Sequence, residues 1–446
     1  MRRPRSPPPA TPPASGEAHS TEQTNAPFGR LLLQGLAVFA ASAAVALPLA
    51  TILPTTVLGA GAAALATGGY PTRLLAQAAP AAPKLDLGDA SSENRELRIV
   101  NFETLEEDAR KMLHPARMAF IGPAGEGLTY RENRRAFNDF PILPRRLQGV
   151  SATAIDMRTK LLEHDLPVPM ITCPMGGHGM FHVNAEVATA GGTGMAGSLY
   201  VSSGAAHKPL EDIGKATPGP KWFQIYMNRD MEINRWLVQR AKAAGFSAIV
   251  LTADALGPNQ SDEYVRYGSP GAPGRTQGNH DPALGGRGNF RDFKFDIGYS
   301  DITFLREASG LPVIVKGVVH PEDIRQSIAA GAGGIWISNH GGRQIDGVPA
   351  AITMLRPAVD VVAGRVPIVF DSGIRRGIDV FKALALGATV VGVGRPVLWG
   401  LINGGAPGVK SVYAHIAAEL KSAMMLSGVA KVTEIKRDHL ALTKAV

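Results

Sequence analysis

The segment SNHGGRQ, residues 338–344, holds the side chains best suited to chemistry. His340 and Arg343 are three positions apart and are separated by two glycines. An imidazole can take a proton near neutral pH, and a guanidinium can hold a carboxylate through two hydrogen bonds. A single histidine is more often structural, but Arg343 beside it and Lys316 one strand earlier favour catalysis. The pair therefore predicts a base next to an anion clamp.

Two glycine-containing segments further on, DSGIRRG and GVGRP, predict a phosphate site. Backbone N–H groups of such turns, together with Arg375 and Arg395, can surround a phosphate. The alternative is two loops with solvated arginines. Because both segments follow the last two predicted strands, where barrels often bind phosphate, we favour the phosphate site.

The elements that position these residues follow from apolar runs that alternate with helical stretches from about Leu97 onward. The helical stretches, such as 231–245, 321–332 and 376–388, each close on glycine. Eight strands alternating with helices predict parallel units closed into an α/β (β/α)8 TIM barrel. The predicted strands are Val168–Cys173, Gly194–Leu199, Trp222–Met227, Ala248–Thr252, Pro312–Lys316, Gly334–Ser338, Pro367–Asp371 and Thr389–Gly394.

Polar or conformationally special residues recur where these strands end. In such a barrel the chemistry lies at the C-terminal ends of the strands. A polar group after nearly every strand therefore predicts an active site built from all the strand-to-helix loops. The glycine- and proline-rich segment 268–292 interrupts the pattern after the fourth strand and is either a lid or a passive loop.

The first 96 residues have a different composition. Residues 1–30 are basic and proline-rich, and we expect them to be disordered. Residues 31–80 contain an uncharged apolar stretch long enough to span a bilayer, and we expect an export signal or membrane anchor rather than a buried pair of core helices. Residues 81–96 are then a linker, and 97–446 form the catalytic barrel. The expected location is periplasmic or membrane-anchored, with the cytoplasm less favoured.

Composition excludes several classes. The net charge is +8, but Lys and Arg are not interleaved with aromatic residues in any block, so a nucleic-acid partner is not expected. The only cysteine, Cys173, lies in an apolar run and excludes both an internal disulfide and a multi-cysteine metal site. We expect no bound metal.

The barrel region resembles the FMN-dependent 2-hydroxy-acid oxidases and dehydrogenases, which include glycolate oxidase, lactate oxidase, lactate monooxygenase and mandelate dehydrogenase. The resemblance runs from about residue 100 to the C-terminus and rests on SNHGGRQ, WFQIY, LTAD, VIVKGV, DSGIRRGIDVFKALALGA and GRP. It implies FMN as cofactor and oxidation of a 2-hydroxy acid to the 2-oxo acid. It also implies a homotetramer.

The resemblance implies a role for each matching residue. His340 takes the hydroxyl proton, Asp254 orients it, Arg343 holds the substrate carboxylate and Tyr226 hydrogen-bonds the substrate. Lys316 stabilises negative charge on the flavin, while the substrate's α-hydrogen passes to flavin N5 as hydride or leaves as a proton. The implied flavin contacts are Met175, Gly176, Ser198, Gln224, Thr252, Lys316, Ser338, Asp371, Gly373, Arg375, Gly394 and Arg395.

The substrate half of the site departs from the family pattern. Asn259 stands where a second carboxylate-binding arginine is expected, and Tyr200 stands where several members have tryptophan. Ala119 or Phe120 replaces the N-terminal substrate tyrosine. An amide brings no charge, which predicts weaker carboxylate binding. We therefore expect a substrate that is larger, or less dependent on its carboxylate, than glycolate or lactate.

Two other functions stay open on the sequence. A flavin-binding barrel with weak turnover could act as a sensing protein, and a phosphate-binding barrel could be an FMN-dependent isomerase. The retained His340, Asp254, Arg343 and Lys316 argue against the first, and SNHGGRQ argues against the second. The electron acceptor is oxygen, a quinone or a cytochrome, and the sequence does not select one.

Overall fold

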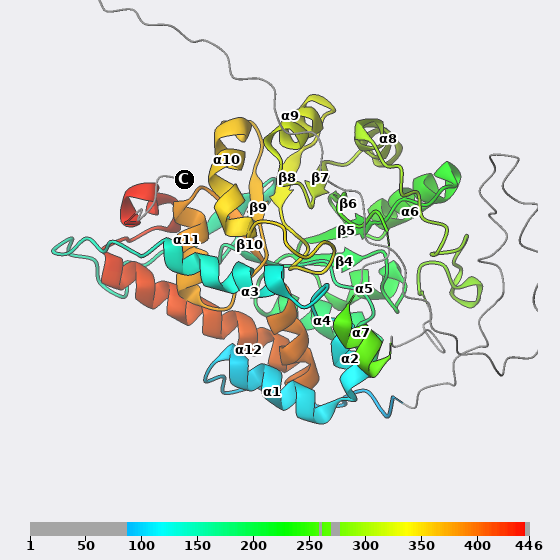
Figure 1. The fold of residues 1–446 in the computed structure, drawn as a ribbon, viewed down its shortest axis with the longest axis horizontal. Helices are drawn as coiled ribbons and strands as arrows, with labels where there is room; N and C mark the ends of the chain where they lie inside the picture. The colour runs from blue at the N-terminus through cyan, green and yellow to red at the C-terminus, as the bar shows by residue number, and fades with distance from the viewer. Residues whose placement is uncertain (1–86, 258–260, 269–276, 442–446) are drawn as a thin grey trace, which may run out of the picture. The chain divides into compact units, whose positions relative to one another are not determined.

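The computed structural model describes residues 87–257, 261–268 and 277–441. Helices and strands alternate through most of this range (Figure 1). The strands are β1 Thr159–Leu161, β2 His164–Leu166, β3 Met170–Thr172, β4 Tyr200–Ser203, β5 Lys221–Ile225, β6 Ile249–Thr252, β7 Val313–Lys316, β8 Gly334–Ile337, β9 Ile368–Phe370 and β10 Val390–Val393. The α-helices are α1 Phe102–Met112, α2 Pro115–Ala119, α3 Leu128–Arg135, α4 Ala185–Met195, α5 Leu210–Ala216, α6 Met231–Ala243, α7 Asp262–Tyr267, α8 Tyr299–Ser309, α9 Pro321–Ala329, α10 Ala351–Val362, α11 Gly377–Ala385 and α12 Arg395–Ser427.

Strands β3 to β10 form one parallel sheet in the order β3-β10-β9-β8-β7-β6-β5-β4. An isolated parallel bridge between Ile171 and Leu199 joins its two edges. Helices surround the strands in Figure 1. This confirms the predicted (β/α)8 barrel, and it brings the C-terminal ends of all eight strands to one face.

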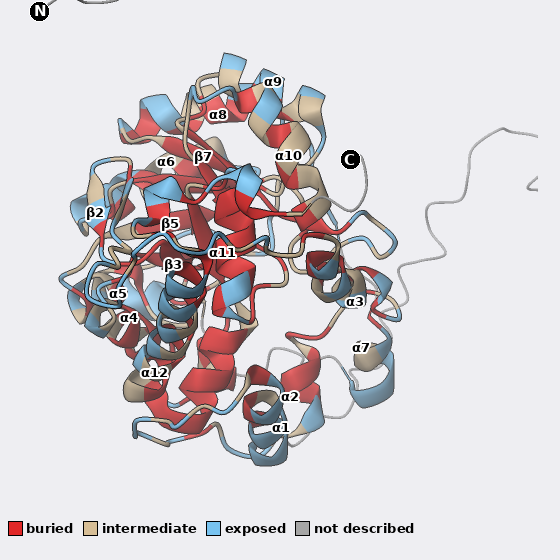
Figure 2. Cartoon of the chain, turned by 90° about the vertical axis from the view of Figure 1, so that its left-hand side faces the viewer, coloured by how far each residue is buried: buried red, intermediate tan, exposed pale blue. Residues whose placement is uncertain are grey.

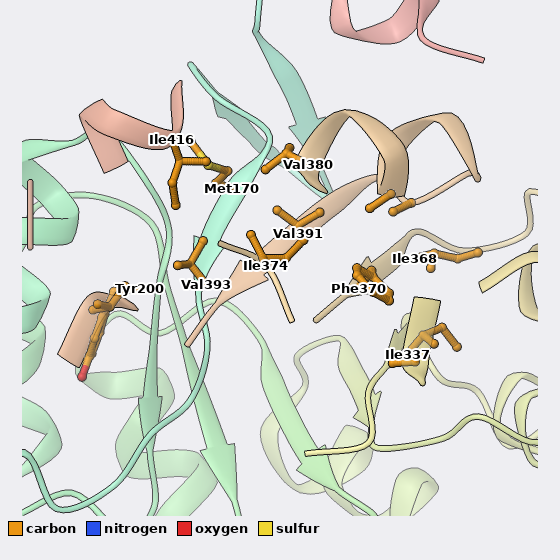
Figure 3. Packing of buried hydrophobic residues seen from close by; sticks show 14 of the residues in the cluster. Met170, Tyr200, Ile337, Ile368, Phe370, Ile374, Val380, Val391, Val393 and Ile416 are labelled. Atoms are coloured by element: carbon orange, nitrogen blue, oxygen red, sulfur yellow. The ribbon is translucent and has the colours of Figure 1, made fainter. Parts of the chain in front are cut away.

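Alternate residues of each strand belong to two different cores. One set packs with the surrounding helices, as Figure 3 shows for Met170, Phe370 and Val391. The other set fills the barrel interior and includes Trp222 and Trp336, both fully buried. In Figure 2 the buried residues are concentrated in the strands and the inner helix surfaces. The barrel is therefore a packed body with no channel through it, and ligands bind at its strand ends.

The second predicted strand, Gly194–Leu199, was wrong. Helix α4 runs to Met195, a turn follows, and the strand β4 begins only at Tyr200. Gly194 reflects close helix packing, because a Cβ there would lie 2.3 Å from Oγ1 of Thr217 at the end of α5, and Gly197, with a φ of 69°, belongs to the turn. A run of small residues thus had two explanations, and helix packing was the correct one.

The segment before the barrel is described only from residue 87. Ser91 donates to the carbonyl of Ile402 through Oγ, at 2.6 Å, and the N–H of Arg95 donates to Gly404. Residues 91–95 therefore pack on α12. The expectations for 1–30 and 31–80, and for the linker up to residue 86, lie outside the described residues, as do residues 269–276 of the predicted lid.

Candidate active site

Two adjoining cavities open at the C-terminal ends of the strands. The first, about 860 Å³, is lined mainly by residues that follow β3, β7, β8, β9 and β10. The second, about 1110 Å³, extends outward towards α7 and the segment 277–295. The residues that line both cavities are Phe120, Ala205, Tyr226, His340 and Arg343.

His340 and Asp254 form a hydrogen-bonded pair between the loops after β8 and β6. The distance from His340 Nδ1 to Asp254 Oδ1 is 2.8 Å. A carboxylate only accepts, so Nδ1 carries the proton and Nε2 of the neutral ring is left with a lone pair. Burial lowers the pKa of His340 against the opposing effect of Asp254. The arrangement is that of an oriented, neutral general base.

Local backbone geometry holds this pair in place. His340 has a φ of 59°, in the left-handed region, and its N–H donates to Ser338 Oγ at 3.0 Å. Gly317, with a φ of 96°, lies directly under Asp254, because a Cβ there would be 2.3 Å from the carboxyl carbon. The carboxylate occupies space that only a glycine leaves open.

Lys316 at the end of β7 is a buried cation within a polar network. Its Nζ donates to Ser338 Oγ at 3.2 Å and lies 3.9 Å from Asp371 Oδ2. Burial opposes the charge, but Asp254 and Asp371 outweigh it and raise the pKa of Lys316. Ser338 in turn donates to Asp371 Oδ1 at 2.6 Å. The first cavity thus has a fixed positive charge on its wall.

Three arginines enclose the other side of the first cavity. Arg395 donates to the carbonyls of Ile121, Gly341 and Gly122, at 2.6, 2.9 and 3.3 Å. Burial lowers its pKa to about 10, which leaves it charged at neutral pH. Arg343 donates to Gly122 at 2.8 Å. Arg375 is also buried, and its guanidinium lies 4.9 Å from the ring centre of Trp399.

The first cavity suits an aromatic group that carries a phosphate. Gln224 on β5 does not line the cavity; its Oε1 accepts from Ser203 Oγ at 2.9 Å, and its buried Nε2 has no partner among the described residues. A buried amide N–H without a partner could donate to a ring carbonyl or a ring nitrogen of a ligand. Arg375 and Gly373 stand beside Arg395 and Gly394 at one end of the cavity, which fits a phosphate. Met175 and Gly176 line the wall near Ala205.

Thr252 and Ser338, like Gln224, are expected flavin contacts that do not line this cavity. Thr252 is buried at the end of β6, in register with Lys316 on β7. Ser338 reaches the cavity only through Lys316 and Asp371. Both support the residues that line the cavity.

Six of the fifteen residues that line the second cavity are phenylalanine or tyrosine. Phe293 lies 4.9 Å from Phe290 and 5.9 Å from Tyr226, both edge-to-face between ring centres. Phe120 replaces the expected substrate tyrosine and lies under the Arg343 guanidinium, 5.5 Å from the ring centre. We call this space the aromatic chamber; its aromatic lining residues are Phe120, Tyr226, Tyr264, Phe290, Phe293 and Phe295.

Two further predicted site residues, Ser198 and Tyr200, lie at the beginning of β4, away from the C-terminal strand ends. Ser198 precedes β4 and donates to the carbonyl of Met170 at 2.6 Å, at the beginning of the strands. Tyr200 is the first residue of β4 and faces the helix layer, where burial raises its pKa (Figure 3). Both predictions were wrong because the strand begins later than the sequence pattern indicated. Asn259 lies outside the described residues.

Several lining residues were not identified from the sequence. The loop after β4 contributes Ala205 rather than Ser198, and Ser372 after β9 donates to Asp371 at 2.7 Å. The phenylalanines of NFRDFKF form one wall of the aromatic chamber. These residues could have been found from the sequence, because three closely spaced phenylalanines, Phe290, Phe293 and Phe295, stand out in an otherwise polar loop.

The geometry defines a (β/α)8 barrel with a phosphate-and-ring cavity beside a histidine base, which is a flavin-dependent oxidoreductase site. The model of the FMN-dependent dehydrogenase family matches residues 109–442. The chain belongs to this family. This confirms the expected class of enzyme, the FMN cofactor and the oxidation of 2-hydroxy acids.

Similar proteins agree with this membership. An L-lactate oxidase of Lactobacillus jensenii is 42% identical over 358 residues, covering 78% of this chain and 87% of that protein. A peroxisomal (S)-2-hydroxyacid oxidase of Arabidopsis thaliana is 38% identical, with 77% and 96% covered. A solved lactate oxidase of Pediococcus acidilactici has a TM-score of 0.75 at 34% identity, with 80% and 98% covered. A solved mandelate oxidase has a TM-score of 0.71 at 34% identity, with 77% and 98% covered.

The expectation of a periplasmic or membrane-anchored enzyme was wrong. Similar oxidases of Arabidopsis thaliana and Oryza sativa are named peroxisomal, which is neither location. Within residues 87–257, 261–268 and 277–441, no helix combines the length and apolar character needed to cross a membrane. The apolar stretch on which the expectation rested lies outside those ranges.

Proposed function

We propose that this enzyme oxidises 2-hydroxy acids with a large apolar or aromatic side chain, using His340 as the base. The observation that carries the proposal is the position of the His340–Asp254 pair, which opens onto both cavities at once. We call the first cavity the flavin cavity. A substrate carbon held at this junction would lie between the flavin cavity and the aromatic chamber. Arg343, which lines both cavities, is the group proposed to bind the substrate carboxylate.

In the proposed mechanism the chain's own residues handle the proton and the charge. The Nε2 lone pair of His340 takes the proton of the substrate hydroxyl, while Asp254 stabilises the imidazolium that results. Tyr226 lines both cavities, and burial raises its pKa, so it stays protonated and can donate to the substrate. Arg343 binds the carboxylate and so orients the C2–H bond towards the first cavity, where the hydrogen is accepted.

FMN, when bound, supplies the two-electron acceptor for the hydrogen removed from C2. Gln224 Nε2 and the Lys316 ammonium would face its ring, where the lysine favours negative charge. Arg375, Arg395 and the turns at Gly373 and Gly394 would hold its phosphate. Met175 and Gly176 would form the wall beside the ring.

The aromatic chamber selects the substrate side chain. Its lining offers aromatic edges and faces, and Phe290, Phe293 and Tyr226 already contact one another edge-to-face. Full burial of a phenyl or branched alkyl group is worth about 1.5–3 kcal/mol, which corresponds to roughly ten- to hundredfold in kcat/KM. A methyl group, as in lactate, would leave most of the chamber unfilled.

Anaerobic mixing of the FMN-loaded enzyme with a panel of 2-hydroxy acids tests the reaction. We expect mandelate, 3-phenyllactate and 2-hydroxyoctanoate to bleach the flavin absorbance, with kcat/KM roughly tenfold or more above that of lactate. Fast reduction by lactate alone would contradict the proposed side-chain preference. No reduction by any acid would contradict the oxidase reaction itself and favour a sensing protein.

Phe293→Ala tests the chamber directly. Loss of the ring is expected to lower kcat/KM for 3-phenyllactate about tenfold and to leave lactate unchanged, because lactate does not reach the ring. Phe304→Ala is the matched control, since this phenylalanine belongs to α8, lies under the guanidinium of Arg235 on α6 and lines neither cavity. Equal losses for the two acids would show that the ring is structural.

Oxygen is the proposed electron acceptor. The support comes from similar proteins named lactate oxidase and (S)-2-hydroxyacid oxidase. Mixing the reduced enzyme with oxygen or with a quinone analogue distinguishes the two, since an oxidase should reoxidise rapidly in oxygen and release peroxide.

A further inference from the structure

Glu186, in the first turn of α4, is a fully buried carboxylate outside both cavities. Its two oxygens accept hydrogen bonds from three backbone N–H groups. Oε1 accepts from His178 at 2.9 Å and from His207 at 3.0 Å, and Oε2 accepts from Lys208 at 3.3 Å. A carboxylate only accepts, so it matches three converging donors better than an amide or a hydroxyl can.

The three donors belong to two different loops. His178 follows β3 in the loop that supplies Met175 and Gly176 to the flavin cavity. His207 and Lys208 follow β4 in the loop that supplies Ala205 to both cavities. Oε1 therefore bridges the two loops directly, since it accepts one N–H from each of them.

These two loops fit together without spare room. The N–H of Gly177 donates to the carbonyl of Ala205 at 3.1 Å. A Cβ on Gly176 would lie 2.6 Å from the Ala205 Cβ, and one on Gly179 would lie 2.3 Å from His207 Nδ1. A shift of either loop would therefore move the wall that both cavities share.

We propose that Glu186 is a positioning residue, which sets the shape of the flavin cavity and of the chamber entrance by fixing these loops to each other. It touches neither ligand. The inference rests on the proposed function of the two cavities. Its consequence is that loss of this one side chain should weaken the binding of both the flavin and the substrate.

Two substitutions of similar size separate the bridge from simple packing. Glu186→Met fills the space but accepts no hydrogen bond. Glu186→Gln keeps one oxygen, which can still accept from His178 and His207, while its NH2 group replaces the acceptor for Lys208. Thr193→Val is the matched control on the same helix, because it removes a buried 2.8 Å hydrogen bond to Thr172 without touching either loop.

The experiment compares the three variants with the wild-type holoenzyme. The readouts are the dissociation constant of FMN, the KM and kcat for the best substrate of the panel, and hydrogen–deuterium exchange in peptides covering 175–180 and 204–209. For Glu186→Met we expect both the FMN dissociation constant and KM to rise about tenfold or more, with faster exchange in both peptides. Glu186→Gln should recover most of this loss, and Thr193→Val should change none of the readouts.

Two results would overturn the proposal. One is a Glu186→Met enzyme whose FMN affinity, KM and loop exchange match those of Thr193→Val. The other is a Glu186→Gln enzyme as impaired as Glu186→Met. If Glu186→Met does not fold, faster exchange confined to the 204–209 peptide of Glu186→Gln supports the proposal, and unchanged exchange there contradicts it. Reduction of the wild-type flavin by substrate tests the function separately.

Discussion

At the residue scale, the proposed base is a pair of side chains, His340 and Asp254, each with its own task. The histidine supplies the lone pair, and the carboxylate fixes the tautomer by accepting from Nδ1 at 2.8 Å. Burial lowers the pKa of His340. The neutral ring, which the proposed proton abstraction needs, therefore persists to a lower pH than for an ordinary histidine. Without Asp254, the ring could rotate or present the wrong nitrogen.

Asp254→Asn should lower kcat/KM by roughly 10²–10⁴-fold, since an amide does not stabilise the imidazolium that forms. Activity is lost as the pH falls through the pKa of His340, because the protonated ring cannot accept a proton. Asp254 raises that pKa. The acidic limb of the kcat/KM profile should therefore move to still lower pH in the variant, as measured by flavin reduction across the pH range.

Asp156→Asn is the control for this substitution. Asp156 precedes β1 and all the barrel strands, and hydrogen bonds from Arg158 lower the pKa of Asp156 to about 2. It lines neither active-site cavity. If the Asp254→Asn enzyme had the same rate and pH profile as this control, the result would contradict the proposal that His340 is the base.

At the scale of elements, the loop after β8 is tied to helix α3 by reciprocal hydrogen bonds. Asp346 accepts from the N–H groups of Gly127, Leu128 and Thr129 at 3.1, 3.0 and 2.7 Å. Thr129 Oγ1 in turn accepts from the N–H of Gly347 at 2.8 Å. This satisfies the free N–H groups at the beginning of the helix and fixes the far end of the loop that carries His340.

Asp346→Ala should lower the free energy of unfolding by about 1 kcal/mol at neutral pH, as expected for loss of a helix cap. Burial opposes the charge, but the hydrogen bonds from Thr129, Leu128 and Gly127 lower the pKa of Asp346 overall. The stabilisation is therefore complete above the unfolded value of about 4 and is lost as the pH falls through the lower folded pKa.

Thermal unfolding at neutral pH and at about pH 3 measures how much stability Asp346→Ala loses and in which direction that loss changes with pH. The difference between wild type and Asp346→Ala should shrink at the lower pH. Asp212→Ala, an exposed aspartate on α5, provides the control. A difference that grows towards acid pH would contradict the assignment.

The sequence predicted these elements well where local pattern determines them. Seven of the eight predicted strands overlap the observed ones, and residues such as Lys316, Asp371 and Arg395 lie where their strands end. The error at Gly194–Leu199 arose because small residues suit close helix packing as well as a strand. The same error led to the wrong site assignments for Ser198 and Tyr200, because these residues lie at the beginning of the observed strand and not at its end.

Contacts between distant segments could not be predicted in this way. Phe120 and Phe293 line one chamber although 173 positions separate them, and no local periodicity relates them. Nothing in the sequence distinguishes Glu186 from the other acidic residues, because its three partners are backbone groups. Backbone N–H groups have no signature in the sequence, so a side chain that binds them is recognised from the structure.

At the scale of the whole molecule, closure of the barrel makes a site from segments that are far apart in the chain. The parallel order of β3 to β10 brings together Met175, which follows the first strand of the barrel, and Arg395, which follows the last. The flavin cavity therefore depends on the complete barrel. A ligand bound there stabilises the folded chain by mass action, because the unfolded chain does not present the site.

Removal of FMN should consequently lower the thermal unfolding midpoint, and the phosphate should account for much of the difference. Hydrogen bonds to charged groups contribute about 1.5–3 kcal/mol each, so loss of the contacts to Arg375 and Arg395 should weaken binding roughly hundredfold or more. Riboflavin, which has the same ring without the phosphate, should therefore raise the midpoint of the apoprotein much less than FMN at equal concentration. Arg375→Met should weaken FMN strongly while leaving riboflavin nearly unaffected, whereas equal stabilisation of the apoprotein by the two flavins would place the phosphate elsewhere.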